Sequence, residues 1–275
     1  MRNLLMSTIL ALGAGPLWAD DLALVLGNER YDRFDRTLQA DDVSAGAVKL
    51  SRLGVQVFSA TNSDTDEMRD QAHSYAERRN SADTQVIALS GRFVTDGNRT
   101  WFLGRDAVRP TLIGVAQSGL SVETMLTLLA TTPGQSVLVL GYDDSATRPL
   151  DVGIREGVGA LDIPQGVTVV HGRPSAVADL LVDTVAEPDG DIIRAVQRNR
   201  RLSVTGFVPQ SLHLLTAEIE PDRRPDAEED AGAGGLLLDL VGLVGGVVDG
   251  DEGQAAAVAA GAVLEEDEGD EDDAG

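Results

Sequence analysis

The 275-residue chain contains no cysteine. A chain without cysteine has no disulfide framework, no thiolate ligand for a metal ion and no cysteine nucleophile. Histidine is scarce as well, and the three that are present are His73, His171 and His213. His73 lies among polar residues without partner ligands at helical spacing, so we interpret it as a surface residue. His213 falls in a predicted strand and is interpreted as a core or edge residue.

Positive charge is also in short supply. Lysine and arginine number 22 against 45 aspartates and glutamates, for a net charge of −23. From residue 217 onward the sequence holds 19 acidic residues and 2 arginines, which leaves a net charge of −6 for the first 216 residues. A surface that binds nucleic acid needs a basic patch to neutralise phosphates, and none stands out here. The composition therefore argues against nucleic acid as a partner.

Long hydrophobic runs are few, and one of them lies at the start of the chain. Residues 1–19, MRNLLMSTILALGAGPLWA, combine a basic Arg2, an apolar run, a Gly/Pro break and a small residue at Ala19. This is the plan of a cleavable secretory signal peptide, and the run is too short for a membrane anchor. A buried first helix is the alternative. We expect a mature chain that begins at Asp20 or Asp21 and is periplasmic or secreted.

The region 20–217 alternates short apolar runs with helical patterns. Runs of strand length stand at 22–27, 55–58, 84–89, 136–140, 167–170 and 211–215. Helical patterns stand at 41–53, 63–80, 121–130, 175–185 and 191–200. Strands that alternate with helices predict one α/β domain with a doubly wound, mostly parallel six-stranded sheet and helices on both faces.

The most informative stretch is 83–106, DTQVIALSGRFVTDGNRTWFLGRD. Residues 84–89 are apolar and rich in β-branched side chains, which is typical of a buried parallel strand. Two short runs, 93–95 and 100–103, flank Asp96-Gly97-Asn98-Arg99 and predict a β-hairpin. The strand ends in Ser90-Gly91-Arg92, at the carboxyl edge where open α/β sheets place their binding sites.

Three segments together resemble a known family: LALVLGNERY at 22–31, the stretch 83–106, and SVLVLGYDDSATRP at 136–149. They are similar to the caspase and metacaspase group of cysteine peptidases (peptidase C14), in the form found in many bacterial proteins. The pattern Gly27-Asn28-x-x-Tyr31 resembles the first strand and loop of that family. Asp41-Asp42 and Arg52-Leu53-Gly54 match its first helix.

The resemblance implies a caspase-like fold and cysteine-type endopeptidase chemistry, but the two residues that would carry the chemistry differ. Where the family motif Ser-Gly-His-Gly supplies a histidine, this chain has Arg92, and where an Asp-Ala-Cys-Arg type motif supplies the nucleophile, it has Asp143. An arginine stays protonated and cannot act as a base, and a carboxylate is a weak nucleophile toward amides. No catalytic residue of the family is intact. Arg92 is expected either to pair with Asp143 in one cleft or to reach solvent.

Other residues near these positions are candidates for the cleft. Ser90 and Ser145 lie beside the family positions, and His171 follows a strand that ends on the same edge. A serine, histidine and acid trio is conceivable from these residues. Asp143-Asp144 would need further ligands to hold a metal ion. The remaining cleft candidates are Asn28, Tyr31 and Gly91.

The segment 218–275 differs in composition and charge from the domain before it. It begins with a charged linker, continues through Gly-rich and Ala-rich stretches, and ends in an acidic block at 265–273. We expect it to be a solvated, disordered tail. The alternative is a tail that binds cations or a basic partner, although it has no Asp/Gly loop with calcium-ligand spacing.

Three hypotheses about function remain open. The first is a secreted, catalytically inactive caspase-like protein that binds an unidentified peptide or protein. The second is a working cysteine-type endopeptidase or other hydrolase with a rearranged site. The third is a carrier domain for the acidic tail. The replaced residues favour the first, for which we expect no cofactor, no metal and no membrane span in the mature chain.

Overall fold

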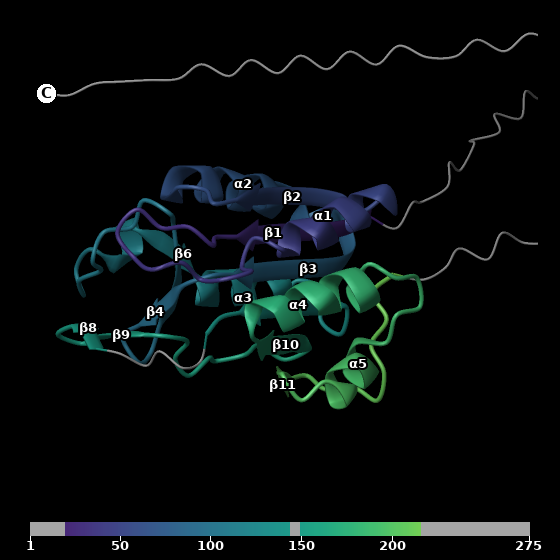
Figure 1. Cartoon of the computed structure of the whole chain (residues 1–275). Coiled ribbons are helices and arrows are strands. Elements are labelled where there is room, and N and C mark those ends of the chain that lie inside the picture. The colour runs from purple at the N-terminus through teal and green to yellow at the C-terminus, as the bar shows by residue number, and fades with distance from the viewer. Residues whose placement is uncertain (1–19, 144–148, 216–275) are drawn as a thin grey trace, which may run out of the picture. The chain divides into compact units, whose positions relative to one another are not determined.

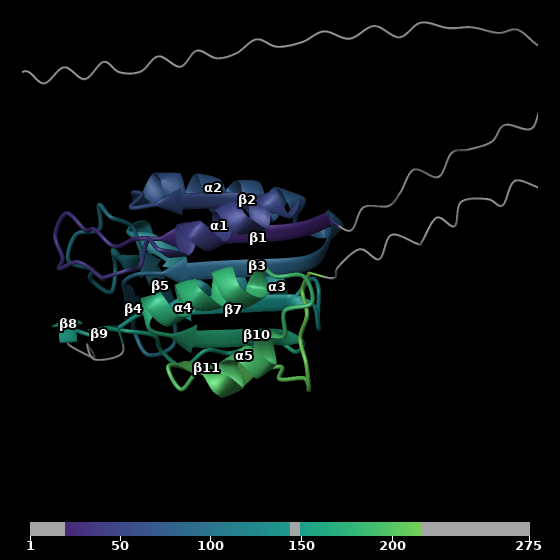
Figure 2. The ribbon, with the colours of Figure 1, turned by 45° about the vertical axis from the view of Figure 1, so that its right-hand side comes forward.

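The computed structural model describes residues 20–143 and 149–215. Their centre is a six-stranded sheet in the order β11-β10-β7-β3-β1-β2 (Figures 1 and 2). Its strands are β1 (Asp20–Gly27), β2 (Gln56–Thr61), β3 (Ala82–Ser90), β7 (Ser136–Gly141), β10 (Val167–Gly172) and β11 (Leu202–Gly206). All neighbours are parallel except β10 and β11. The predicted α/β class with a mostly parallel six-stranded sheet is confirmed.

Both faces of this sheet are buried, which explains why its strands read as continuous apolar runs. In β1, Leu22, Leu24 and Leu26 face one core, whereas Ala23 and Val25 face the other. The first core is closed by α2 (Thr65–Arg78) and α3 (Val122–Leu129), and the second by α1 (Val43–Arg52), α4 (Pro174–Leu180) and α5 (Ile192–Arg198). Figure 2 shows α1, α4 and α5 on the same side of the strands.

Helix ends follow the local signals in the sequence. Asp64 caps α2 by accepting a hydrogen bond from the Glu67 amide at 2.9 Å, and Ser121 caps α3 through the Thr124 amide at 3.2 Å. A side-chain oxygen at the cap satisfies an amide that has no partner within the helix. Short helical turns complete the set: η1 (Arg79–Ser81), η2 (Val115–Gln117) and the π-helical η3 (Leu181–Val185), which continues α4.

A second, five-stranded sheet stands at the carboxyl edge of the first, in the order β6-β5-β4-β9-β8. Its strands are β4 (Phe93–Thr95), β5 (Thr100–Leu103), β6 (Gly119–Ser121), β8 (Pro149–Asp151) and β9 (Ile154–Glu156). The predicted hairpin is confirmed as β4 and β5, which pair antiparallel. The other three strands were not predicted, because each has only three residues and shows no periodicity.

The predicted last strand at 211–215 is wrong. Leu212, Leu214 and Leu215 are buried, so the apolar pattern is real, but their backbone pairs with the turn before α5. The Leu212 carbonyl accepts from the Ile192 amide at 3.0 Å, and the Leu215 carbonyl accepts from the Asp189 amide at 2.8 Å. The sixth strand is instead β11, which pairs with β10 antiparallel.

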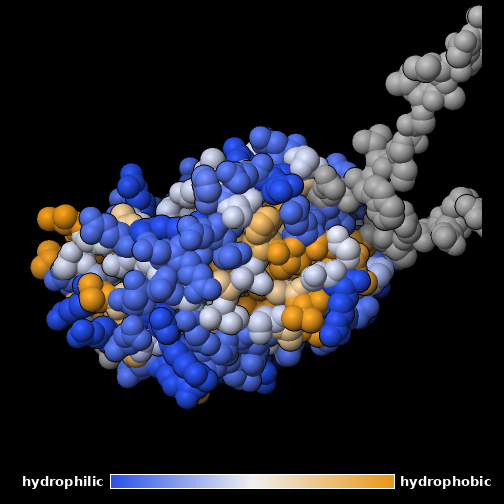
Figure 3. Space-filling view, turned by 90° about the horizontal axis from the view of Figure 1, so that it is seen from above, coloured by the Kyte–Doolittle hydropathy of each residue, from blue (hydrophilic) through white to orange (hydrophobic). Residues whose placement is uncertain are grey.

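Several large apolar side chains of the described residues are exposed, among them Ile113 and Val152. Figure 3 shows a face that is mainly hydrophilic, with apolar atoms gathered at its left-hand end and in a patch to the right of centre. Within 20–143 and 149–215, no helix is long and apolar enough to cross a membrane. The predicted signal peptide, Asp144, Ser145 and the acidic tail lie outside the described residues.

Candidate functional site

Four neighbouring parallel strands, β1, β3, β7 and β10, end in register at the carboxyl edge of the large sheet. Gly27 lies opposite Ser90, Ser90 opposite Gly141, and Gly141 opposite Gly172. Residues that follow these positions therefore converge above the same row of the sheet. In open α/β sheets this carboxyl edge is the usual place for a binding site.

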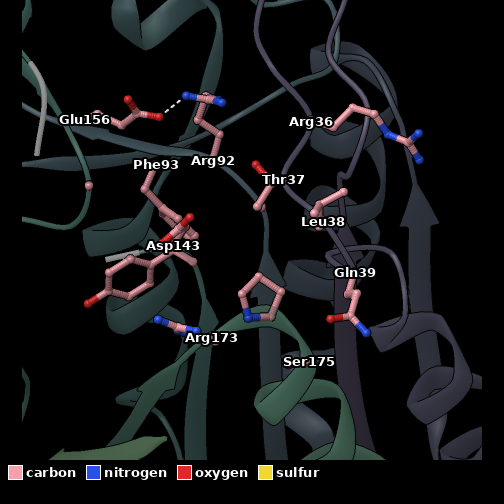
Figure 4. A pocket seen from close by; sticks show the side chains of 14 residues that line it. Arg36, Thr37, Leu38, Gln39, Arg92, Phe93, Asp143, Glu156, Arg173 and Ser175 are labelled. Carbon is pink, nitrogen blue, oxygen red and sulfur yellow. Dashed lines mark hydrogen bonds and ion pairs between the residues drawn. The ribbon is translucent and has the colours of Figure 1, made fainter. Parts of the chain in front are cut away.

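A cavity of about 380 Å³ lies at this edge (Figure 4). It is lined by residues 36–39, 91–93, 142–143, 156–157 and 173–175. The first range belongs to the loop after β1, and the others follow or belong to β3, β7, β9 and β10. Arg92 and Asp143, which the sequence singled out, thus line one cavity.

Arg92 is buried among partners at this cavity, with 8% of its surface exposed. Its Nη1 donates to Oε1 of Glu156, which is equally buried, in a close ion pair that Figure 4 marks. Its Nη2 donates to the backbone carbonyl of Asp35 at 2.9 Å. The guanidinium carbon lies 5.1 Å from the ring centre of Phe34 and 5.7 Å from that of Tyr31. The cation is thereby neutralised, hydrogen-bonded and packed against two aromatic rings.

Glu156 supplies a carboxylate against Arg92, and the burial of Arg92 overturns the alternative that this side chain reaches solvent. Glu156 is 64 residues away in sequence. Glu156 lies beside Arg92 because β9 pairs with β4, with Val94 opposite Glu156. Asp143 is exposed at the rim of the same cavity. No local pattern in the sequence marks β9, so the partner of Arg92 was out of reach of sequence reasoning.

Gly91 and Tyr31 form a tight joint beneath Arg92. The phenolic oxygen of Tyr31 accepts from the Arg92 amide at 2.7 Å, and burial raises the pKa of this phenol well above its ordinary value. Gly91 has φ +151°, and a Cβ there would lie 2.6 Å from the Tyr31 hydroxyl and 2.8 Å from the Asn28 carbonyl oxygen. Position 91 therefore requires glycine.

Asn28 is fully buried and ties three segments together rather than lining the cavity. Its amide nitrogen donates to the carbonyls of Ser63 at 3.3 Å and Leu103 at 3.1 Å. Its side-chain oxygen accepts from the Ser63 amide at 2.9 Å. The Gly-Asn-x-x-Tyr motif thus supplies structural residues that hold the edge in place.

The histidines and Ser90 do not form a nucleophilic site within the described residues. Ser90 is fully buried and does not line the cavity, and its hydroxyl has no hydrogen-bond partner among those residues. His171 lies with Nδ1 3.3 Å from the Tyr142 hydroxyl, and the two rings stack. His73 is exposed beside Glu77, as predicted, whereas His213 is exposed and lies in no strand. Over the same residues no three acidic or histidine side chains gather to hold a metal ion.

Sequence reasoning missed the loop side chains that line the cavity. Arg36 pairs with Glu29, and the Gln39 amide donates to the other Glu29 oxygen at 3.0 Å. Arg173 is exposed on the side of the cavity opposite Arg92 in Figure 4. The one sequence signal beside Arg173 was Pro174, because proline is favoured at the first position of a helix and α4 begins there.

Similarity to known proteins is found among solved structures and at low sequence identity. No family model matches the chain, and no curated protein matches it. The solved structure of pro-sf-caspase-1 is similar, with 12% sequence identity over 73% of this chain and 92% of that chain, and a TM-score of 0.42. What this cavity can do chemically therefore follows from its own residues.

Proposed function

We propose that this chain is a secreted caspase-like protein that performs no thiol chemistry and binds a peptide or a protein segment in the cavity at the carboxyl edge of its sheet. The observation that carries the proposal is the buried Arg92–Glu156 pair. It stands where the motif of the resembling family has its catalytic histidine. A buried arginine in an ion pair cannot transfer protons in catalysis. It can hold the cavity in a fixed shape for binding.

The residues at the two family positions, Arg92 and Asp143, argue against peptidase catalysis. The guanidinium of Arg92 remains protonated and cannot accept a proton from a nucleophile. The chain has no cysteine, and the Asp143 carboxylate that takes its place would form an anhydride with a peptide carbonyl. The family motif has glycine after its histidine, whereas this chain has the buried Phe93.

Binding is favoured by the size of the cavity and by the mixture of groups around it. A volume of about 380 Å³ falls within the range of ligand sites, roughly 300 to 1,000 Å³. Arg173, Gln39 and Ser175 offer polar contacts, and the exposed Leu38 offers an apolar one. A peptide presents the same mixture of backbone polar groups and side chains. The secretory location rests on the predicted signal peptide at 1–19.

A peptide library displayed on beads and probed with the labelled full chain tests binding. Selected peptides should lose at least about tenfold in affinity, or roughly 1.4 kcal/mol, in Leu38→Glu. Leu38 lines the cavity and is 69% exposed, so the change should not disturb folding. Ile113→Glu is the matched control, because Ile113 is exposed and lies outside the cavity lining. Failure to select any peptide, or equal binding by Leu38→Glu, contradicts the proposal.

The same preparation should leave fluorogenic peptides uncleaved after Arg, Lys or Asp. Persistent turnover by purified chain that disappears in His171→Ala or Ser145→Ala would revive the hypothesis of a working hydrolase. No contact of the described residues favours that alternative at present.

A further inference from the structure

We propose that Arg92 is a positioning residue, which together with Glu156 holds residues 35–39 in place as one wall of the cavity. This inference rests on the proposed function in one respect, namely that the cavity binds a ligand. The wall segment, as residues 35–39 are called from here on, supplies four of the residues that line the cavity.

The wall segment has few means of holding itself in place. Asp35, Arg36, Leu38 and Gln39 are exposed, and Thr37 is the one buried residue. A segment with so little burial has low local stability unless hydrogen bonds attach it to the frame. Its position therefore depends on its attachments.

One set of attachments joins the wall segment to its own loop. The Thr37 amide donates to the Glu29 carbonyl at 2.9 Å, and the Glu29 carboxylate receives Arg36 and the Gln39 amide. Glu29 precedes the wall segment in the same loop, so these bonds shape the loop. They do not fix it relative to the second sheet.

Arg92 supplies an attachment of the wall segment itself to the second sheet. It lies between β3 and β4, its Nη1 donates to Glu156 at the end of β9, and its Nη2 donates to the Asp35 carbonyl at 2.9 Å. Asp35 is the first residue of the wall segment. One guanidinium therefore connects the large sheet, the second sheet and the wall.

The geometry needs arginine specifically. A guanidinium presents several donors in a planar fork, so it can bind a carboxylate and a carbonyl at once while it lies against the ring of Phe34. A lysine in its place would keep the charge for Glu156 and lose the second bond. Glu156 is required for the buried cation, because an unpaired charge there would carry a large desolvation cost.

Hydrogen exchange of the full chain without any ligand tests the inference. In Arg92→Lys the amides of Thr37 and Gln39 should exchange about fivefold faster, which is the expected effect of one lost hydrogen bond. Amides in β7, such as that of Leu138, should keep their rates. Unchanged exchange at residues 37 and 39 in a folded Arg92→Lys protein overturns the inference.

Arg69→Lys is the matched control. Arg69 also ties a distant loop by its guanidinium, donating to the carbonyls of Ala116 at 3.1 Å and Gln117 at 2.8 Å. Its replacement should speed exchange near residues 114–118 and leave the wall segment alone. Equal effects of both substitutions on the wall would mean that the response is a general loss of stability, and would contradict the positioning role.

A second measurement covers the case in which Arg92→Lys does not fold. Because the chain has no cysteine, Leu38→Cys gives a single site for a nitroxide spin label. The label should become more mobile in Glu156→Gln, whereas a label introduced by Ile113→Cys should not change. Equal mobility at position 38 with and without Glu156→Gln overturns the inference. Neither readout needs a ligand, so a failed peptide selection would contradict the proposed function and leave this result standing.

Discussion

The phenolic oxygen of Tyr31 accepts a hydrogen bond from the backbone N–H of Arg92 at 2.7 Å, while the Tyr31 ring lies 5.7 Å from the Arg92 guanidinium carbon. The Tyr31 side chain thus contacts both the backbone and the side chain of Arg92. Tyr31 belongs to the loop after β1, and Arg92 follows β3. The contact therefore joins two strand ends at the base of the cavity.

Tyr31→Phe should lower the free energy of unfolding by about 1 to 3 kcal/mol, because it leaves the buried amide of Arg92 without its acceptor. Urea unfolding measures the change. Tyr142→Phe is the control, since Tyr142 is only partly buried and its hydroxyl lies 3.3 Å from Nδ1 of His171. A smaller loss for Tyr31→Phe than for Tyr142→Phe would contradict the importance of the Tyr31 bond.

Stability should fall in alkaline solution. Burial raises the pKa of Tyr31 and of Tyr75, so the folded state holds these protons more tightly than the unfolded state does. Their contribution is complete below the unfolded tyrosine pKa of about 10 and is lost as the pH rises above it. Unfolding free energies measured from pH 8 to 11 should decline, and less steeply in Tyr31→Phe. Parallel curves for the two proteins would refute the role of Tyr31.

Arg92 and Glu156 should show strong coupling in a double-mutant cycle. Arg92→Met and Glu156→Leu should each cost about 3 to 5 kcal/mol in urea unfolding, because each removes the ion-pair partner of a buried charge, and the double variant should cost less than their sum. The pair Lys49–Glu187, whose side chains are much more exposed, is the control, with an expected coupling below about 1 kcal/mol. Additive losses at Arg92 and Glu156 would show that the pair is not the unit we describe.

Gly91→Ala should cost roughly 2 to 5 kcal/mol, from backbone strain combined with the close approach to Tyr31 and Asn28. Gly54→Ala separates the two effects. Gly54 has φ +90° but nothing within 4 Å of an added Cβ, so strain alone of about 1 to 2 kcal/mol is expected. Similar losses at both glycines, measured by thermal or urea unfolding, would contradict the contact argument.

Five of the six strands of the large sheet, and its helices, could be predicted from local patterns in the sequence. β1, β3 and β7 could be predicted because their cores lie on both faces, which requires runs of consecutive apolar residues. The starts of α2 and α3 could be predicted because their caps are bonds across three residues. The β4–β5 hairpin followed from its turn. Each of these signals is local.

The sequence placed Gly91, Arg92 and Asp143 at the cavity, but the partner of Arg92 and the wall of the cavity depend on tertiary contacts. The carboxylate for Arg92 came from β9, a three-residue strand whose pairing with β4 supplies the hydrogen bonds that so short a segment cannot provide for itself. The wall formed by residues 35–39 has no period, and its place depends on bonds to Glu29 and Arg92. Likewise, 211–215 has the alternation of a strand, but β11 occupies the sheet edge beside β10. Hydrophobic periodicity is a local signal. It therefore does not predict contacts between short segments that lie far apart in the sequence.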